Sequence, residues 1–179
     1  ESDLKNVRTL LTYIKNMMLN EEELQKLEEE SDIRIAGIYR EYCRQMREKK
    51  LMDYDDQMLY AYNILRKDLG VLAYFQNRYP YICVDEAQDT SKIQHAIIAL
   101  LAAGTGNLFM VGDEDQSIYG FRAAYPEALL SFEKKHSGAK VLLMEENFRS
   151  NAKIVEAADK FIQKNTLRHE KHMRAARGA

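Results

Sequence analysis

Two adjacent carboxylates, Asp85 and Glu86, directly follow the short apolar run of residues 81–84. Two negative charges at the end of a buried strand repel each other unless a cation or a proton offsets them. Mg²⁺ suits this position because it prefers oxygen ligands and is usually held by one or two carboxylates together with substrate phosphates. We predict a magnesium site at Asp85 and Glu86. Asp85 would anchor the ion, and Glu86 would polarise an attacking water as general base, a role that typically contributes ~10²–10⁴-fold in rate.

The same acidic pair has two other interpretations. An Asp-Glu pair commonly begins a loop or caps the next helix without any catalytic role. A magnesium-dependent nuclease is a further alternative, in which carboxylates converge on a pair of metal ions. The acids of that alternative site are Asp85, Glu86, Asp89 and Asp113. The helical pattern that starts soon after Asp89 makes such convergence less natural.

A second acidic segment, residues 111–122 (VGDEDQSIYGFR), combines a glycine turn, acids, an amide, two aromatic residues and an arginine. Beside a phosphate-binding site, the amide of Gln116 can donate a hydrogen bond to a terminal phosphate oxygen and report its presence. Tyr119 and Phe121 could each stack on a base, worth ~1–3 kcal/mol per base, with Arg122 close to backbone phosphate. The structural alternative places both rings in the core and Arg122 on the surface.

A third polar segment, residues 145–150 (EENFRS), follows the apolar run of residues 141–144. Arg149 could place its planar guanidinium on a phosphate and stabilise the charge that develops during transfer, as an arginine finger does. Phe148 could lie against a flat purine ring. An Arg-Ser pair before a helix is also typical of simple capping, with Ser150 as the N-cap residue.

Each polar segment follows an apolar run of strand length, at residues 81–84, 108–111 and 141–144. Helical patterns such as residues 93–101 separate the strands, and this alternation predicts a parallel, buried sheet in an α/β fold. The polar segments then emerge at the carboxyl edge of that sheet, where open α/β folds place their ligands. The predicted site therefore gathers residues that are far apart in the sequence.

The N-terminal part, residues 1–50, is predicted to be helical. Apolar residues recur there at the three-and-four spacing of an amphipathic helix, at Leu4, Val7, Leu11, Ile14 and Met18. The acidic stretch of residues 21–30 is typical of a solvated helix face. A further helix is expected after Asp32, as its N-cap residue.

The composition excludes few classes of protein. The 179 residues suffice for one core with a small appended element, and 26 basic residues nearly balance 28 acidic ones. The net charge of −2 therefore argues neither for nor against a local site for nucleic acid. No apolar run approaches a membrane span, and neither a signal-peptide pattern nor zinc-type cysteine spacing is present, so we expect a soluble cytoplasmic protein.

Together, and in the same order, the polar segments resemble motifs II, III and IV of the UvrD/Rep-like superfamily-1 DNA helicases: DEAQDT (85–90), GDEDQSIYGFR (112–122) and ENFRS (146–150). Residues 52–56 (MDYDD) resemble the family's DFDD element, and residues 165–171 resemble the stretch that follows motif IV. The resemblance covers residues 52–171 well. Residues 1–51 fit by position, as the family's helical insertion.

The resemblance implies a partial RecA-like (P-loop NTPase) parallel sheet with flanking helices, preceded by a helical subdomain. The implied parts are a helical insertion at residues 1–51, a partial ATPase domain at 52–150, and a helix at 151–179 that leads toward a second RecA-like domain. The implied function is part of an ATP-dependent helicase that moves three-prime to five-prime on single-stranded DNA, and unwinds duplex junctions, by hydrolysing Mg-ATP.

The resemblance also implies a role for each matching residue. Asp85 binds Mg²⁺ and Glu86 activates water. Gln116 and Arg149 contact the γ-phosphate, and Phe148 packs on adenine. The residues that would face single-stranded DNA are Tyr119, Phe121 and Arg122.

The sequence departs from the family's pattern in ways that bear on activity. None of the eight glycines precedes a lysine, so the sequence contains no GxxxxGK[ST] phosphate loop. We therefore expect an internal piece of a helicase that is inactive alone, with an unpaired sheet edge that favours self-association. The alternative is a non-catalytic module, derived from a helicase, that binds DNA or a partner.

Two smaller features complete the comparison with the family. In motif III, Ala123-Ala124 stands where the family usually has Gly-Ala, which stiffens the loop, and Phe121 stands where many members have tryptophan. The basic residues interpreted as a solvated tail are His169, His172 and Arg174.

Overall fold

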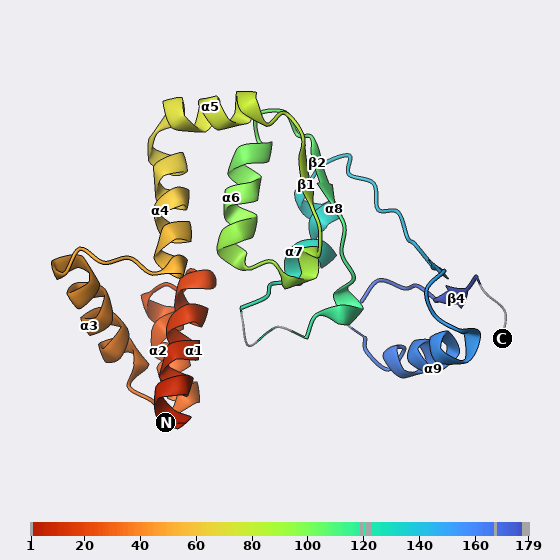
Figure 1. Cartoon of the computed structure of the whole chain (residues 1–179), viewed down its shortest axis with the longest axis horizontal. Coiled ribbons are helices and arrows are strands. Elements are labelled where there is room, and N and C mark those ends of the chain that lie inside the picture. Colours follow the sequence, from red (N-terminus) through yellow and green to blue (C-terminus); the bar gives the residue numbers. More distant parts are fainter. Residues whose placement is uncertain (1, 119, 121–122, 167, 177–179) are drawn as a thin grey trace.

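The computed structural model describes residues 2–118, 120, 123–166 and 168–176, and it shows a helix-dominated α/β fold with short parallel strands (Figure 1). The longer helices are α1 (Ser2–Asn16), α2 (Glu21–Ser31), α3 (Ile35–Glu48), α4 (Tyr54–Lys67), α5 (Leu69–Arg78), α6 (Lys92–Ala102) and α9 (Ala152–Ile162). The shorter elements are β1 (Ile82–Val84), η1 (Ala87–Asp89), β2 (Leu108–Met110), η2 (Glu114–Gln116), α7 (Glu127–Leu130), α8 (Phe132–Lys135), β3 (Glu146–Asn147) and β4 (Arg174–Ala175).

Helices α1, α2 and α3 pack around a small apolar core formed by Ile14, Leu24, Ile35 and Ala36. The amphipathic spacing predicted for the first helix is confirmed, because its apolar face packs in this core. The acidic stretch forms α2, which buries Leu24 and leaves most of its acidic residues exposed, as predicted.

The predicted N-cap role of Asp32 is wrong. Asp32 closes α2 instead, with a left-handed φ of 54°, and Arg34 precedes α3. Aspartate tolerates this conformation because its short side chain can bond locally. α2 begins with a capping box, in which the Asn20 side chain accepts from the Glu23 N–H at 2.9 Å and the Glu23 carboxylate accepts from the Asn20 N–H at 2.8 Å.

A buried lysine joins α1 to the start of α4. The Lys15 side chain is 1% exposed, and its Nζ lies 2.7 Å from carboxylate oxygens of both Asp53 and Asp56. The Tyr42 hydroxyl of α3 donates to Asp53 at 2.5 Å. Burial alone would lower the pKa of Lys15, but the hydrogen bonds to Asp53 and Asp56 raise it above its ordinary value. The segment that resembles the DFDD element therefore ties three helices together.

The predicted parallel pairing of the first two strands is confirmed. Ile82 of β1 lies opposite Leu108 of β2, and Val84 lies opposite Met110. Figure 1 shows α6 between α4 and this strand pair, and α6 contacts both. The carboxyl ends of both strands therefore point to one edge of the fold.

The prediction that residues 141–144 form a third strand of the sheet is wrong. This segment runs as an extended coil from α8 toward β3 (Figure 1). No strand in the described part of the chain pairs with it, and a strand without a partner leaves its backbone groups unpaired. Leu142 and Met144 are each 81% exposed, and Phe109 of β2 is exposed as well, so the predicted burial of the sheet is also wrong.

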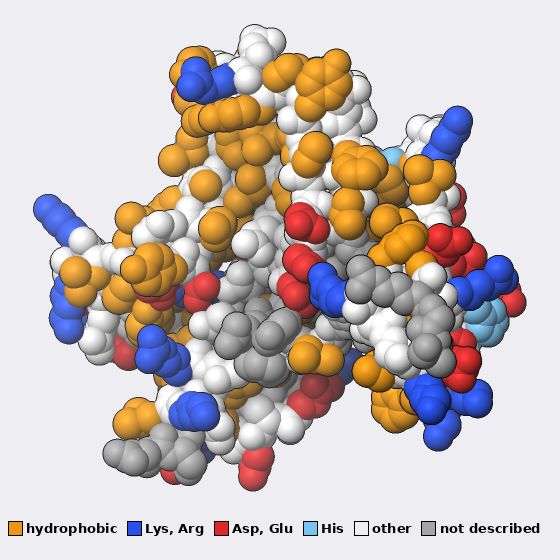
Figure 2. All heavy atoms as spheres, turned by 45° about the vertical axis from the view of Figure 1, so that its right-hand side comes forward, with side chains coloured by type: hydrophobic (Ala, Val, Ile, Leu, Met, Phe, Trp, Pro, Cys, Tyr) orange, Lys and Arg blue, Asp and Glu red, His pale blue; other side chains and the backbone are white. Residues whose placement is uncertain are grey.

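Many exposed apolar side chains lie over α5 and the strand pair. Figure 2 shows hydrophobic side chains spread over the upper half of the molecule, where α5 and the strand pair lie. The exposed apolar residues there include Leu69, Tyr74, Tyr79, Tyr81 and Phe109. None of the described helices has the length and apolar character needed to cross a membrane.

The C-terminal part combines α9 with a second parallel strand pair. Glu146 of β3 lies opposite Arg174 of β4. The alternative role of Ser150 as N-cap is wrong, because the N-cap residue of α9 is Asn151, whose side chain accepts from the Lys153 N–H at 3.0 Å. After α9 the chain turns back, which brings residues 168–175 against both β3 and η2.

Replacing Lys15 by Met should lower the free energy of unfolding by about 3 kcal/mol, the low end for breaking a buried pair, because the half-buried Asp53 and Asp56 then keep their charge without a cation. Urea denaturation of this chain measures the loss. Lys26→Met is the matched control, since the Lys26–Glu30 pair on α2 is exposed, with its atoms 3.9 Å apart, and such pairs contribute ~0.3–0.5 kcal/mol. Equal losses in both variants would contradict a special role for Lys15.

Candidate functional site

The carboxylates that follow β1 lie in solvent at the carboxyl edge of the strand pair. Asp85 and Glu86 are both exposed, and Glu86 has a left-handed φ of 51°. Residues other than glycine rarely adopt this conformation, and functional sites are where it concentrates. The turn is anchored because the Ala87 N–H donates to the carbonyl of Val111 at 2.9 Å. Both predicted metal-site residues are therefore accessible.

A buried glutamine, Gln88, joins the loops that follow β1 and β2. Gln88 is 1% exposed. Its Nε2 donates to Glu86 Oε2 at 2.7 Å, and its Oε1 accepts from the Asp113 N–H at 3.0 Å. One buried side chain therefore fixes the Glu86 carboxylate relative to the loop that carries Gln116.

Gly112 allows these two loops to approach each other. A Cβ at Gly112 would lie 2.8 Å from Gln88 Oε1, 3.1 Å from Leu129 Cδ2 and 3.2 Å from the Ala87 nitrogen. A close-packed interior has no room for a carbon at such distances. A side chain here would therefore push Gln88 out of its place between the loops.

Gln116, at the end of η2, is exposed, and its Nε2 donates to Asp113 Oδ2 at 2.7 Å. Glu86, Gln88, Asp113 and Gln116 consequently form one continuous hydrogen-bonded chain, which we name the edge chain. The structure thus connects two of the predicted site residues, Glu86 and Gln116.

Basic residues near the C-terminus neutralise the acids of the loop after β2. Arg168 binds Asp115 through two nitrogens, at 2.9 and 2.7 Å, with both side chains nearly buried. Lys171 Nζ lies 2.7 Å from Asp113 Oδ1 and 3.1 Å from Glu114 Oε2. The loop therefore obtains its positive charge from within the chain.

The interpretation of this region as a solvated tail is wrong. The His169 N–H donates to Glu114 at 2.8 Å, the His172 N–H donates to Glu145 at 2.9 Å, and Arg174 lies in β4. The sequence does not reveal these contacts, because the acids that His169 and His172 contact lie far from them along the chain.

Two acids of this loop, Asp113 and Glu114, have lowered pKa values. Burial raises the pKa of Asp113, but hydrogen bonds from Lys171 and Gln116 outweigh it and hold the pKa below its ordinary range. For Glu114 the same balance gives a lowered pKa, with the His169 N–H and Lys171 as donors. Both carboxylates are therefore charged at neutral pH, as their ion pairs require.

Arg149 and Phe148 lie on an exposed turn after β3. Asn147 Oδ1 holds this turn by accepting from the N–H groups of Arg149, at 2.9 Å, and Ser150, at 2.8 Å. Phe148 is 64% exposed, so its ring is open to a ligand. Residues 168–175 contact both this turn's strand and the edge chain, and they connect the two.

The residues predicted to face DNA lie outside the described residues; they are Tyr119, Phe121 and Arg122. The chain just beyond them is anchored by an antiparallel bridge between Ser91 and Ala124. Ala123 is fully buried with a φ of 62°, a conformation that favours glycine. An alanine where the family usually has glycine therefore strains this loop.

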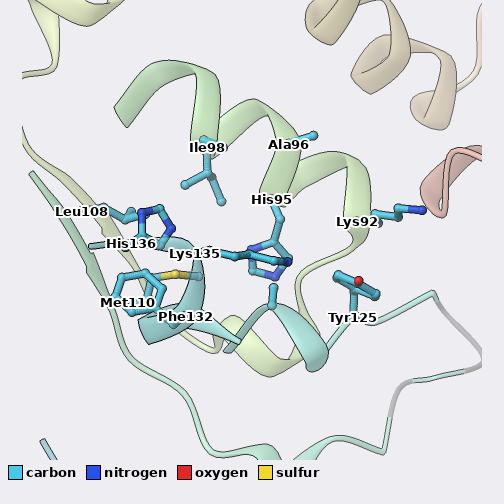
Figure 3. A pocket seen from close by; sticks show the side chains of 12 residues that line it. Lys92, His95, Ala96, Ile98, Leu108, Met110, Tyr125, Phe132, Lys135 and His136 are labelled. Carbon is cyan, nitrogen blue, oxygen red and sulfur yellow. The ribbon is translucent and has the colours of Figure 1, made fainter. Parts of the chain in front are cut away.

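Two cavities lie away from the predicted site residues. One, of about 250 Å³, lies between α6, β2 and the short helices α7 and α8, and Figure 3 shows His95 and Tyr125 beside it. His95 Nε2 is buried without a hydrogen-bond partner among the described residues, and burial lowers the pKa of His95. The other, of about 430 Å³, lies between α3 and α4 beside Tyr42. Neither cavity is lined by the predicted site residues that the structure describes, and Asp85, Glu86 and Gln116 lie on the exposed edge of the strand pair.

The carboxylates at this edge suit one cation better than a metal pair. Asp113, which the nuclease alternative requires, is already bound by Lys171 and Gln116. Among the described residues, no group of three or more His, Cys, Asp or Glu side chains is placed to hold a metal ion, so Asp89 does not join the other acids in a shared site. The exposed Asp85 fits the way in which Mg²⁺ is held by one or two carboxylates together with a ligand's own oxygens.

Sequence analysis missed three residues that hold this edge together, Gln88, Arg168 and Lys171. Gln88 lies inside the DEAQDT segment, two residues after Glu86, and this short spacing is the sequence feature that could have indicated a contact with Glu86. For Arg168 and Lys171 the sequence gives a weaker indication of their contacts. It consists only of their basic charge, in a stretch that resembles the one following motif IV.

Residues 1–137 match the UvrD/REP helicase N-terminal domain family. The chain is similar to the ATP-dependent DNA helicase PcrA of Staphylococcus epidermidis (strain ATCC 35984), with 38% identity over 164 residues, which cover 90% of this chain and 22% of that protein. It is also similar to the PcrA helicase of Staphylococcus aureus (strain Mu50), with 42% identity over 137 residues, covering 76% of this chain and 19% of that protein. The chain therefore spans about a fifth of the length of these relatives.

Gly112→Ala should lower the free energy of unfolding by about 1–3 kcal/mol, because the added methyl group overpacks the contact with Gln88 and Leu129. The matched control is Gly37→Ala in α3, where a Cβ meets nothing within 4 Å and alanine favours the helix by about 1 kcal/mol. Urea denaturation compares the two variants. A Gly112→Ala protein as stable as the parent would contradict the close approach of the two loops.

Acid should release the loop of residues 113–115 from Lys171. The pKa values of Asp113 and Glu114 lie below their ordinary 3.8 and 4.5, so their contribution to stability is complete above those ordinary values and is lost as pH falls through the lowered ones. Lys171→Met should therefore cost about 3–5 kcal/mol near neutral pH. The cost, measured by urea denaturation, should shrink as pH falls below these ordinary values and the two carboxylates become protonated; a cost that does not change with pH would contradict this origin.

Proposed function

This chain belongs to the UvrD/REP helicase N-terminal domain family, and from that premise we propose that it is part of an ATP-dependent DNA helicase. In this proposal the complete protein couples hydrolysis of Mg-ATP to three-prime to five-prime movement along single-stranded DNA and to unwinding at duplex junctions. The similarity to two PcrA helicases over most of this chain supports the proposal.

The edge chain carries the proposal. It joins Glu86, which we assign as the general base for water, to Gln116, which we assign as the sensor of the terminal phosphate. Gln88 orients the Glu86 carboxylate by donating to it at 2.7 Å, so that the carboxylate has a defined position before substrate arrives. The Gln116 amide donates to Asp113, and a terminal phosphate oxygen would compete with Asp113 for that NH₂ group.

The remaining roles follow from exposure at the same edge. Asp85 would hold Mg²⁺, which, when bound, supplies positive charge against the phosphates. Arg149 would place its guanidinium on the γ-phosphate, and the open ring of Phe148 would pack on adenine. The residues that we assign to single-stranded DNA are Tyr119, Phe121 and Arg122. Because they follow Gln116 directly, a movement of Gln116 reaches the DNA contacts through a short loop.

We assign residues 1–51 to the helical insertion, residues 52–150 to a partial RecA-like ATPase domain, and residues 151–179 to the segment that leads toward a second RecA-like domain. The unpaired residues 141–144 support a sheet that further strands of a longer protein complete. In isolation the same open edge would favour self-association.

A non-catalytic module that binds DNA or a partner is the alternative proposal. Its support is the lack of a GxxxxGK[ST] phosphate loop in this sequence. The ordered edge chain favours the helicase, because a module without catalysis has no need to orient Glu86.

We expect Mg-dependent, DNA-stimulated ATP hydrolysis from a longer natural polypeptide that contains this chain, and none from this chain alone. Glu86→Gln in the longer protein should lower kcat by about 10²–10⁴-fold, because general-base catalysis is lost. Binding of single-stranded DNA, measured by fluorescence anisotropy, should stay the same.

The control is Glu156→Gln, a matched change on the exposed surface of α9, which should leave hydrolysis unchanged. Wild-type rates in the Glu86→Gln protein would remove Glu86 from catalysis. A longer protein that binds DNA but hydrolyses no ATP would favour the non-catalytic module.

A further inference from the structure

We propose that residues 168–175, which we name the clasp segment, are a positioning element that ties the loop of Gln116 to the turn of Arg149. This inference rests on the proposed function, because it concerns the two residues assigned to the γ-phosphate. The clasp segment contacts the acids just before Gln116 and the strand just before Arg149, and each of its ends makes a different set of contacts.

The first end of the clasp segment grips the loop after β2. Arg168 binds Asp115 with side chains that are 5% and 11% exposed, and Lys171 binds Asp113 and Glu114 with a side chain that is 10% exposed. Exposed ion pairs contribute little to structure, whereas buried pairs with several hydrogen bonds hold one geometry. Asp113 is also the residue that accepts from the Gln116 amide, so Lys171 and Gln116 share one carboxylate.

The second end of the clasp segment holds the turn after β3. β4 pairs with β3, and the Arg174 N–H donates to the Glu145 carbonyl at 2.7 Å. The Ala176 N–H, directly after the clasp segment, donates to the carbonyl of Asn147 at 2.9 Å. The side chain of Asn147 in turn fixes the backbone of Arg149.

Helix α9 braces the middle of the clasp segment. Asp159 accepts from the Met173 N–H at 3.0 Å and contacts His172 Nδ1 at 3.2 Å, and Gln163 Nε2 donates to the Lys171 carbonyl at 3.0 Å. These bonds hold the middle of the clasp segment between its two ends, so we expect a displacement of one end to be passed to the other. A shift of Gln116 toward a phosphate would therefore reach Arg149 through Asp113, Lys171 and β4.

This arrangement gives the clasp segment a function beyond holding the fold together. Two groups that must reach one phosphate at the same time are placed by a single segment, so their positions depend on each other. Physical contact alone does not demonstrate coupling, which requires that a change at one end alters the other. The two ends can be separated experimentally.

The first experiment uses hydrogen–deuterium exchange on this chain with the double variant Arg168→Met/Lys171→Met. We expect amide exchange to rise by at least about tenfold both at residues 114–117 and at residues 149–150, although the variant removes contacts only at the first end. Faster exchange at residues 114–117 alone would overturn the proposal. Arg44→Met is the control, because Arg44 makes short ion pairs on the exposed face of α3.

A charge-reversed pair of substitutions distinguishes loss of the Arg168–Asp115 contact from general unfolding of the variant. Arg168→Asp alone should speed exchange at both places, and Arg168→Asp combined with Asp115→Arg should restore protection at both. Failure of the pair to restore protection at residues 149–150, with residues 114–117 restored, would also overturn the proposal.

The second experiment measures ATP hydrolysis by the longer natural polypeptide. Lys171→Met should lower kcat by about 10–10²-fold, as expected when reacting groups are misplaced, and should change KM by less than about threefold. A larger rise in KM with kcat unchanged would show that the clasp segment supports binding only, and would overturn the proposal. If the unaltered protein hydrolyses no ATP, the proposed function fails, and the exchange experiment still decides whether the clasp segment couples its ends.

Discussion

Negative charge gathers where β1 and β2 end, and each carboxylate there needs a donor or a cation. Gln88 meets Glu86, Lys171 meets Asp113 and Glu114, and Arg168 meets Asp115. These partners come from two separate stretches of the chain, residue 88 and residues 168–171, so satisfying the charge brings both stretches against the loop after β2. Asp85 and Glu86 both stay exposed, and Asp85 has no ion-pair partner among the described residues, which leaves it available for the Mg²⁺ proposed above.

A second lysine is placed between carboxylates at the other end of the molecule. Lys15 is buried between Asp53 and Asp56, much as Lys171 is buried among the acids of η2. Buried charges of this kind give uncertain net stability, because desolvation opposes attraction, but they do specify geometry when every partner is in place. One lysine positions the N-terminal helices against α4, and the other positions the C-terminal segment against the candidate site.

Sequence alone could predict the parts of this fold that depend on local pattern. The apolar runs at β1 and β2, the helical spacing of α1 and the position of Asp85 and Glu86 at a strand end are all local, and they are confirmed. Residues 141–144 have the same pattern but no paired strand in the described chain, which a local pattern cannot reveal. The partners of Gln88 and Lys171 escape prediction for a similar reason, because contacts between distant residues leave no periodic trace.

The number of residues between two contacting partners also influences the order in which contacts form during folding. The clasp segment meets η2 across 53 to 58 residues, whereas the strand pair closes over far fewer. Closing a longer loop costs more entropy and contributes to slower folding, so the clasp contacts should form after the helices and the first strand pair. Until then, three adjacent acids in η2 and its start repel one another. A newly made chain therefore passes through a period in which the loop of residues 113–116 is unformed, and the docking of residues 168–175 ends that period.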